Sequence, residues 1–205
     1  MQSLHVEHSN DKLYSFNETS NNIALQLLSL PLGYHYLLLY HNIETIRKIY
    51  AEYIGIQIKE YNVEILFLPY YDTTDKVRQV LTRNGLDVSN YEKNNSLTLI
   101  DFGAVVDNPY LGIPAAFGLK EFINKIQTYR KNKKKNLVII ADMSLYSHHN
   151  NTNDLLEYEK LLHSGYGIVN WKQLCLYHKL DFNRMFTDEQ KQQIVDYHKD
   201  KVINI

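Results

Sequence analysis

The chain has 205 residues, of which 44% are apolar and 22% charged, and its formal net charge is −1. These values describe one globular domain with a sizeable core, and they give no overall attraction to nucleic acid or anionic membranes. Cys175 is the single cysteine, which excludes an internal disulfide framework. Because no signal peptide or membrane-length apolar stretch is present, we expect a cytoplasmic protein without a membrane partner.

The chain begins with a polar stretch that has no periodicity, so we predict a flexible arm over residues 1–19 and one α/β domain over 20–205. "NNIALQLLSL" predicts a short helix. "YHYLLLY" (34–40) is an almost continuous apolar run, typical of a strand buried on both faces of a parallel sheet. Asn42 is the predicted N-cap of a helix. Apolar residues recur behind it at helical spacing: Ile43, Ile46, Tyr50, Tyr53 and Ile54.

The next segments repeat this strand–helix pattern. "VEILFLP" (63–69) predicts a second buried strand, and Asp72 is predicted to begin the helix that follows. Gly85, after Asn84, is predicted to end that helix, because glycine readily adopts the left-handed conformation found there. "SLTLIDF" (96–102) predicts a third strand. Residues 103–117 contain glycines and prolines and are predicted to form a long loop.

The second half of the chain continues in the same way. A single apolar stripe predicts a helix over 119–130, and "NLVIIADM" predicts the fourth strand over 136–143. Residues 144–153 are polar and are predicted to form a loop. The helix after that loop should bury one face, formed by Leu155, Tyr158 and Leu162.

The last predicted elements are a strand, "QLCLYH" (173–178), and a helix that begins with a capping box at Thr187 and Gln190. Strands that alternate with helices of about 10–16 residues are the signature of βαβ units. The sequence therefore predicts a single three-layer α/β domain with a mainly parallel sheet of five or more strands.

The junction between the first strand and its helix is where a nucleotide-binding α/β protein would carry a phosphate loop. Such a loop needs glycines, whose backbone N–H groups wrap the phosphate, and a lysine. After the first predicted strand, no glycine occurs until Gly55 and no lysine until Lys48, and Glu44 places an acid in the first helical turn. These features argue against triphosphate hydrolysis.

Ligands of parallel sheets bind beyond the carboxyl ends of the strands. Asp142 ends an apolar strand, as do the magnesium-binding acids of nucleotide hydrolases, but "LTLID" at 97–101 shows the same pattern. A hydrogen bond to a ligand or to the next loop is the preferred interpretation. The groupings His148-His149 with Asp154 and Cys175 with His178 lack the spacing of zinc sites, so no metal is predicted.

The basic run "RKNKKK" (130–135) follows a predicted helix. Cations there complement the helix dipole, and no aromatic residues interleave with them. We therefore interpret the run as a solvated helix end and predict no direct contact with nucleic acid.

Several segments, taken in order, resemble the MEDS family, the sensory domain of methanogens, methylotrophs and the dichloromethane-responsive repressor. They are "GYHYLLLY" (33–40), "NGLDV" (84–88), "LTLID" (97–101), "ADMSLY" (141–146), "LEYEK" (156–160), "LCLYHKLDF" (174–182) and "HKDKVI" (198–203). The resemblance implies a degenerate relative of RecA- and KaiC-type domains that has lost its phosphate loop. It also implies a non-catalytic sensor of small hydrocarbon derivatives.

The resemblance and the strand-end argument together give a set of candidate ligand-binding residues: His35, Tyr40, His41, Asn42, Asp142, Ser144, Tyr158, Glu159, Cys175, Tyr177 and His198. Three residues depart from the family's pattern, in which a cysteine, a tryptophan and an aspartate stand at Leu37, Leu145 and His178.

The sequence thus predicts a sensory domain that catalyses nothing, needs no cofactor, and binds an unknown small molecule or a signalling partner. That partner would be a separate histidine kinase or transcription regulator, because the N-terminal segment is too short for a helix-turn-helix unit. Two alternatives remain open at this point. One is a RecA-like module that binds a nucleotide without hydrolysing it, and the other is a pure protein-interaction module.

Overall fold

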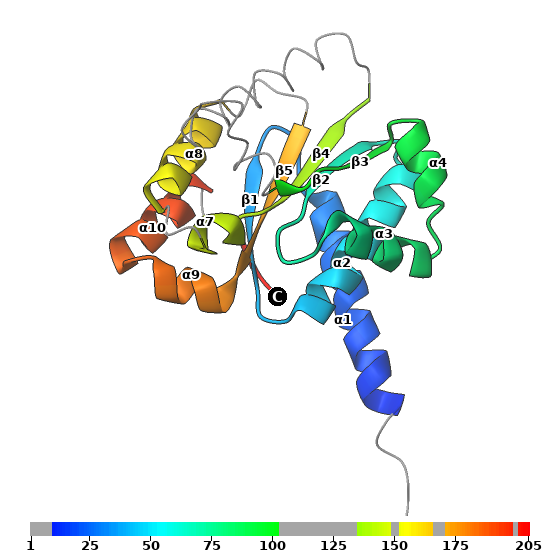
Figure 1. The fold of residues 1–205 in the computed structure, drawn as a ribbon. Coiled ribbons are helices and arrows are strands. Elements are labelled where there is room, and N and C mark those ends of the chain that lie inside the picture. The colour runs from blue at the N-terminus through cyan, green and yellow to red at the C-terminus, as the bar shows by residue number, and fades with distance from the viewer. Residues whose placement is uncertain (1–9, 103–134, 149–151, 166–170, 199–200) are drawn as a thin grey trace, which may run out of the picture.

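The computed structural model describes residues 10–102, 135–148, 152–165, 171–198 and 201–205. Within these ranges the chain forms a six-stranded sheet in the order β3-β2-β4-β5-β1-β6 (Figure 1). All of its neighbouring strands pair in parallel. The strands are β1 (His35–Tyr40), β2 (Glu64–Leu68), β3 (Leu97–Leu99), β4 (Leu137–Asp142), β5 (Trp171–His178) and β6 (Val202–Asn204).

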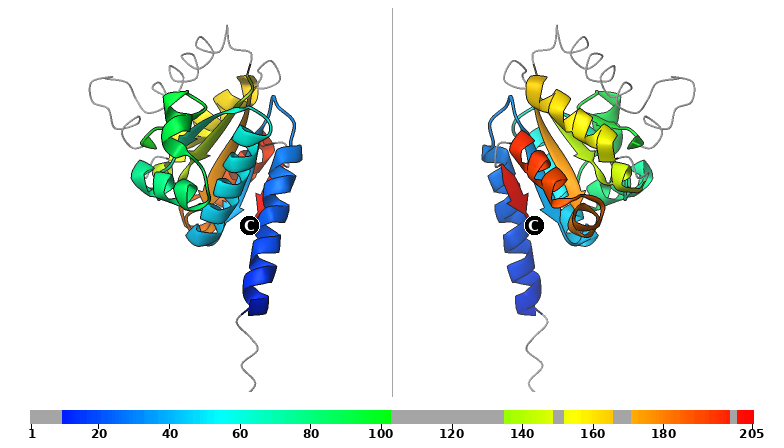
Figure 2. Two further views of the ribbon diagram at one scale, coloured as in Figure 1. Left: turned by 90° about the vertical axis from the view of Figure 1, so that its right-hand side faces the viewer. Right: turned by 90° about the vertical axis from the view of Figure 1, so that its left-hand side faces the viewer.

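Helices cover both faces of the sheet, which gives the predicted three layers (Figures 1 and 2). One face carries α1 (Asn10–Ser29), α2 (Ile43–Lys59), α3 (Thr74–Arg83) and α4 (Val88–Lys93). The opposite face carries α7 (Ser144–His148), α8 (Thr152–Gly165), α9 (Lys179–Met185) and α10 (Asp188–Tyr197). None of the helices in the described ranges is both long and apolar enough to cross a membrane.

Each face of the sheet has its own core, because successive side chains of a strand point to opposite sides. In β1, Tyr36 and Leu38 join the core under α1 to α3, whereas Leu37 and Leu39 join the core under α7 to α10. Every residue of β1 is buried, as expected for a strand with parallel neighbours on both sides and helices over both faces.

After the adjacent parallel strands β1 and β5, the chain continues to opposite faces of the sheet. After β1 it enters α2 on one face, and after β5 it enters α9 on the other. Such a change of side between neighbouring parallel strands opens a crevice at their carboxyl ends, which is where open α/β sheets bind ligands. The topology therefore directs attention to the ends of β1 and β5.

Several local predictions are confirmed. Asn42 caps α2, with its side-chain oxygen accepting hydrogen bonds from the amides of Glu44 and Thr45. Gly85, with φ of 77°, follows the last turn of α3. The capping box at Thr187 and Gln190 begins α10.

Two boundaries differ from the prediction. Helix α1 begins at Asn10, so its first half covers residues that the sequence assigned to a flexible arm. No glycine or proline interrupts residues 10–30, so the helix continues toward the N-terminus. In the predicted loop 144–153, residues 144–148 form helix α7, and Leu145 and Tyr146 are buried in the core.

The N-cap of α3 is also corrected. Thr73, not Asp72, caps this helix by accepting a hydrogen bond from the amide of Lys76. Asp72 instead pairs with Arg47 of α2. Helices α4 and α9 and the edge strand β6 are short elements that the sequence analysis did not predict. The predicted loop 103–117 and helix 119–130 lie outside the described residues.

A buried lysine ties α1 to the sheet. The side chain of Lys172 in β5 is 3% exposed, and its Nζ donates hydrogen bonds to the carbonyl oxygens of Leu27 and Leu30, at 2.9 and 3.0 Å. These carbonyls belong to the last turn of α1 and its exit, where a cation also complements the helix dipole. Burial lowers the pKa of Lys172 to about 8.

This lowered pKa predicts a pH dependence. Between pH 8 and 10.5 the unfolded chain binds more protons at Lys172 than the folded chain does, so stability rises with pH in that window. We expect the wild type to gain about 2 kcal/mol across it relative to Lys172→Met, which does not titrate there. Urea unfolding of both proteins at each pH measures the difference, and a constant difference would contradict the prediction.

Candidate functional site

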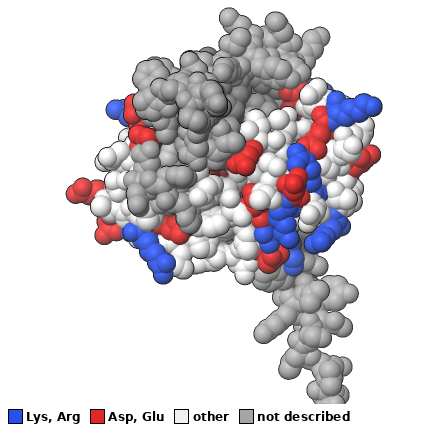
Figure 3. Space-filling model, viewed as in Figure 1, with Lys and Arg blue, Asp and Glu red and all other residues white. Residues whose placement is uncertain are grey.

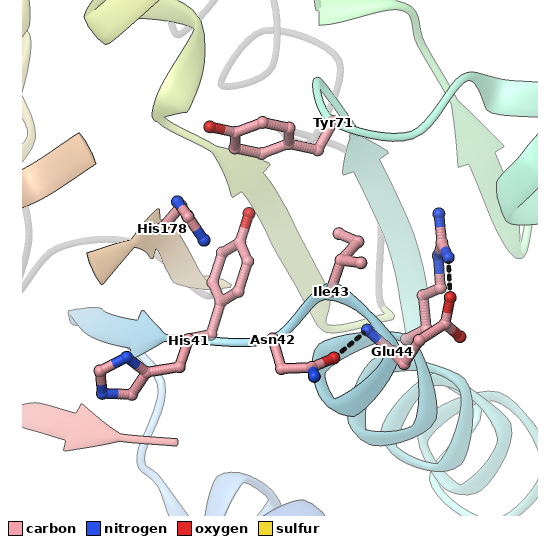
Figure 4. Close-up of a pocket in the computed structure, with 8 residues that line it drawn as sticks. His41, Asn42, Ile43, Glu44, Tyr71 and His178 are labelled. Carbon is pink, nitrogen blue, oxygen red and sulfur yellow. Dashed lines mark hydrogen bonds and ion pairs between the residues drawn. The ribbon is translucent and has the colours of Figure 1, made fainter. Parts of the chain in front are cut away.

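A pocket of about 540 Å³ lies at the carboxyl ends of β1 and β5, where the topology predicts a crevice. Figure 4 shows Tyr71 and His178 facing each other above the turn that leads from β1 into α2. The lining residues are Tyr40, His41, Asn42, Ile43, Glu44, Arg47, Tyr71 and His178.

Aromatic side chains form one wall of the pocket. The ring of His178 lies 5.4 Å from that of Tyr40 and 5.5 Å from that of Tyr71, measured between ring centroids. Asp181, in the first turn of α9, accepts a hydrogen bond from the Tyr71 hydroxyl and lies 3.3 Å from Nδ1 of His178. This aspartate therefore holds the Tyr71 ring over the pocket and lies beside the His178 ring.

The opposite wall is the start of α2, and its amide groups are already used. Asn42 Oδ1 accepts hydrogen bonds from the amides of Glu44, at 2.7 Å, and Thr45, at 3.3 Å (Figure 4). The side chain of Glu44 is 69% exposed and adds a negative charge at the same place. A phosphate group at this helix end would have to displace the cap and approach a carboxylate.

Arg47 is the cation that lines the pocket, and two carboxylates engage it. It forms an ion pair with Glu44 and a two-pronged contact with Asp72, in which Nε donates to Oδ2 at 3.0 Å. The Tyr50 hydroxyl also donates to Asp72, at 3.2 Å. Hydrogen bonding to Asp72 raises the pKa of Arg47. The positive charge of Arg47 is thus fully compensated by carboxylates of the protein itself.

Asp142 supports the pocket from behind. Its carboxylate accepts hydrogen bonds from the amides of Tyr71 and Ser144, both at 3.1 Å. Burial raises the pKa of Asp142, and the backbone hydrogen bonds oppose that rise. Asp142 therefore braces the loop that carries Tyr71. Bracing a loop was one of the two roles that the sequence suggested for this residue.

A second polar group lies inside the core, between the sheet and helices α8 and α10. It consists of His35, Glu159, Cys175 and His198, which we call the buried cluster. One donor atom of each residue lies within 4.8 Å of those of the other three. The four residues are 0–3% exposed. Glu159 is central, since its Oε2 lies 3.3 Å from His35 Nδ1 and 3.6 Å from His198 Nε2.

Neighbouring groups fix the orientation of the buried cluster. His35 Nε2 lies 2.7 Å from the carbonyl oxygen of Tyr197, and His198 Nδ1 lies 2.7 Å from that of Ile194. The Tyr177 hydroxyl donates to Glu159 Oε1. Gln173, the residue of β5 opposite His35 in β1, donates to the sulfur of Cys175 at 3.4 Å.

The electrostatics of the cluster follow from burial and from its own members. Burial raises the pKa of Glu159, but the neighbouring imidazoles of His198 and His35 and the hydrogen bond from the Tyr177 hydroxyl outweigh burial and lower it overall. Burial lowers the pKa of His198 to about 4 and raises that of the Cys175 thiol well above its usual value. These shifts favour the carboxylate of Glu159, the neutral imidazole of His198 and the thiol of Cys175.

The structure divides the sequence-predicted candidates between these two places. The pocket and its support contain Tyr40, His41, Asn42, Asp142 and Ser144. The buried cluster and its immediate partners contain His35, Tyr158, Glu159, Cys175, Tyr177 and His198.

Sequence reasoning missed Arg47, and it weighed the strand-end residues Tyr71 and His178 without keeping them in the final set of candidates. The signal for the last two was present, because Tyr71 closely follows β2 and His178 ends β5. Arg47 gave no signal, since it occupies an ordinary polar position of a helix. The sequence analysis also did not predict a role for Gln173 or for the carbonyl of Tyr197, because only the fold places them beside the buried cluster.

The outer surface of α3 and α4 carries mixed charges. In Figure 3, blue and red atoms alternate over α3 and α4 on the described part of that face. Arg78, for example, contacts Asp75 at 2.8 Å and Glu92 at 2.9 Å. No extended patch of one sign is visible among the described residues of this view, unlike the surfaces that bind nucleic acid backbones.

The sheet order, the helices on both faces and the crevice at the strand ends define a RecA-like α/β domain. A solved KaiC-like protein from Pyrococcus horikoshii has the same fold, with a TM-score of 0.55 and 14% identity over 80% of this chain and 69% of that one. No curated protein matches the sequence. The family model of MEDS, the methanogen/methylotroph, DcmR sensory domain, matches residues 34–199. The chain therefore belongs to the MEDS family of sensory domains.

Proposed function

We propose that this sensory domain detects a small, uncharged molecule, such as a simple hydrocarbon derivative, in the pocket at the carboxyl ends of β1 and β5. The supporting observation is the pocket itself, which lies at the topological switch point and is walled by the rings of Tyr40, Tyr71 and His178. The rings supply apolar contact area, while their polar atoms and the Asn42 amide can orient a ligand.

The charged groups around the pocket are already paired with one another, which supports an uncharged ligand. Arg47 is engaged by Glu44 and Asp72, so a ligand carboxylate or phosphate would compete with two existing ion pairs. A ligand cation would in turn lie close to Arg47 itself. A neutral molecule meets neither obstacle.

A ligand in this pocket would also alter the contacts of Asp181, in α9, with Tyr71 and His178. A shift of α9 would report ligand binding to a separate signalling protein.

The test is a thermal-shift screen with small alcohols, amides and halogenated hydrocarbons, followed by calorimetry on each compound that stabilises the protein. We expect Tyr71→Ala to weaken binding at least about tenfold, because it removes one aromatic wall. Tyr61→Ala is the matched control, since Tyr61 is 60% exposed and lies beyond the far end of α2. A ligand whose affinity is equal in wild type and Tyr71→Ala would contradict the pocket assignment.

The nucleotide alternative makes a different prediction. Because Asn42 caps the first amides of α2 and Glu44 adds a negative charge there, we expect no binding of ATP or ADP with magnesium at concentrations of about 1 mM. Calorimetry with the full chain measures this directly. A dissociation constant well below that concentration would favour a nucleotide-binding module instead. By the same reasoning we expect no triphosphate hydrolysis.

A further inference from the structure

We propose that the buried cluster binds one divalent transition-metal ion, with Zn²⁺ as the ion that its donors suit best. One thiol, two imidazoles and one carboxylate are all established zinc donors, and four of them complete a tetrahedral site. This site is separate from the pocket of the proposed function and does not depend on it.

The donor positions fit such a site. In tetrahedral zinc sites with bonds of about 2.0–2.3 Å, neighbouring donor atoms lie about 3.3–3.8 Å apart. Glu159 Oε2 already meets this spacing, at 3.3 Å from His35 Nδ1 and 3.6 Å from His198 Nε2. The widest separation in the cluster is at most 4.8 Å, so an inward movement of about 1 Å completes the geometry.

The hydrogen atoms of the two imidazole rings point away from the centre. A carbonyl oxygen can only accept, so His35 must carry a hydrogen on Nε2, toward Tyr197, and His198 on Nδ1, toward Ile194. In neutral rings the other two nitrogens then direct lone pairs at the Glu159 carboxylate. Lone pairs and a negative charge that face one another at 3.3 and 3.6 Å repel, and a metal ion bound between them would turn this repulsion into coordination.

Within the described part of the chain, two buried atoms that face the centre of the cluster lack a hydrogen bond. Neither Glu159 Oε2 nor His198 Nε2 has a hydrogen-bond partner among the described residues, although both side chains are fully enclosed. The outer atoms of the same groups are satisfied, since Tyr177 donates to Glu159 Oε1 and His198 Nδ1 donates to a carbonyl. Metal-binding histidines and carboxylates show this pattern, in which the second polar atom is held by an outer partner.

Charge balance also favours a divalent ion. A carboxylate, a thiolate and two neutral imidazoles carry a charge of −2, so Zn²⁺ would leave the buried site neutral and avoid the cost of a buried net charge. All four protein donors would be used and none is accessible to water. The site is therefore of the structural kind, and the ion would fasten α8 and the end of α10 to β1 and β5.

The test uses the full chain purified without a histidine tag. We expect elemental analysis to find one zinc per chain, and treatment with a chelator followed by Co²⁺ to give the visible bands of tetrahedral cobalt with a thiolate-to-cobalt charge-transfer band. We also expect removal of the metal to lower the melting temperature. A chain that is folded, metal-free and unable to take up one equivalent of Zn²⁺ or Co²⁺ would overturn the proposal.

Two variants locate the site. Cys175→Ala removes the sulfur with little change in volume, so the charge-transfer band should disappear and the zinc affinity should fall at least about 100-fold. His163→Gln is the matched control: His163 Nδ1 also contacts the Tyr197 carbonyl, at 2.7 Å, but lies outside the cluster. It should keep the band and one equivalent of metal. Retention of the band in Cys175→Ala would also overturn the proposal.

Discussion

Replacing Asp72 with alanine is expected to lower the free energy of unfolding by about 3 kcal/mol, because it leaves the Arg47 guanidinium largely buried without its two-pronged partner. The Tyr50 hydroxyl loses its acceptor in the same step. Urea unfolding of wild type and variant gives the difference directly.

A double variant separates the ion pair from the packing around it. Replacing both members with apolar residues, as in Arg47→Met with Asp72→Ala, leaves no buried charge, so it should recover most of the lost stability. Glu44→Gln is a second control, since the side chain of Glu44 is 69% exposed and its ion pair with Arg47 should contribute less than about 1 kcal/mol. If Asp72→Ala costs no more than Glu44→Gln, the pair does not have the structural role assigned to it.

The second large effect is expected for Asp142→Ala. The variant leaves the part-buried amide of Tyr71 and the buried amide of Ser144 without their acceptor, which costs about 2–4 kcal/mol together. Because the Tyr71 amide is tied to Asp142, we also expect faster hydrogen exchange of that amide and weaker binding at the pocket. Urea unfolding and amide exchange measured by NMR follow the two consequences separately.

Asp142→Asn is the matched variant. The asparagine side chain keeps one of the two acceptor oxygens and carries no charge. Losing the charge is tolerated because burial already opposes it, as the raised pKa of Asp142 shows. The asparagine variant should therefore be more stable than the alanine variant by at least about 1 kcal/mol. Equal stabilities for the two would show that the hydrogen bonds of Asp142 do not brace the loop.

Most of the secondary structure could be predicted from local patterns, because those patterns report burial and capping directly. The apolar runs at 34–40, 63–69 and 136–143 became β1, β2 and β4, and the cap at Asn42 formed as expected. The errors occurred where tertiary contacts decide. Asp72 resembles an N-cap, but its carboxylate is held by Arg47, which is 25 residues away in sequence.

The candidate site illustrates the same division. The sequence by itself determined the α/β class, the absence of glycines and an accessible lysine after the first strand, and the membership of a sensory family. It gave the candidate residues as a single set, because strand-end position and family resemblance do not tell which face of the sheet a side chain occupies.

Only the tertiary structure separated that set into a pocket and a buried cluster. His35 and Tyr40 lie in one strand, but the alternation of side chains and their position along β1 place them in different cores. The cluster joins residues 35, 159, 175 and 198, whose spacing matches no metal motif. Their proximity depends on the parallel pairing of β1 with β5 and on the packing of α8 and α10 over both strands, and local sequence does not encode such long-range contacts.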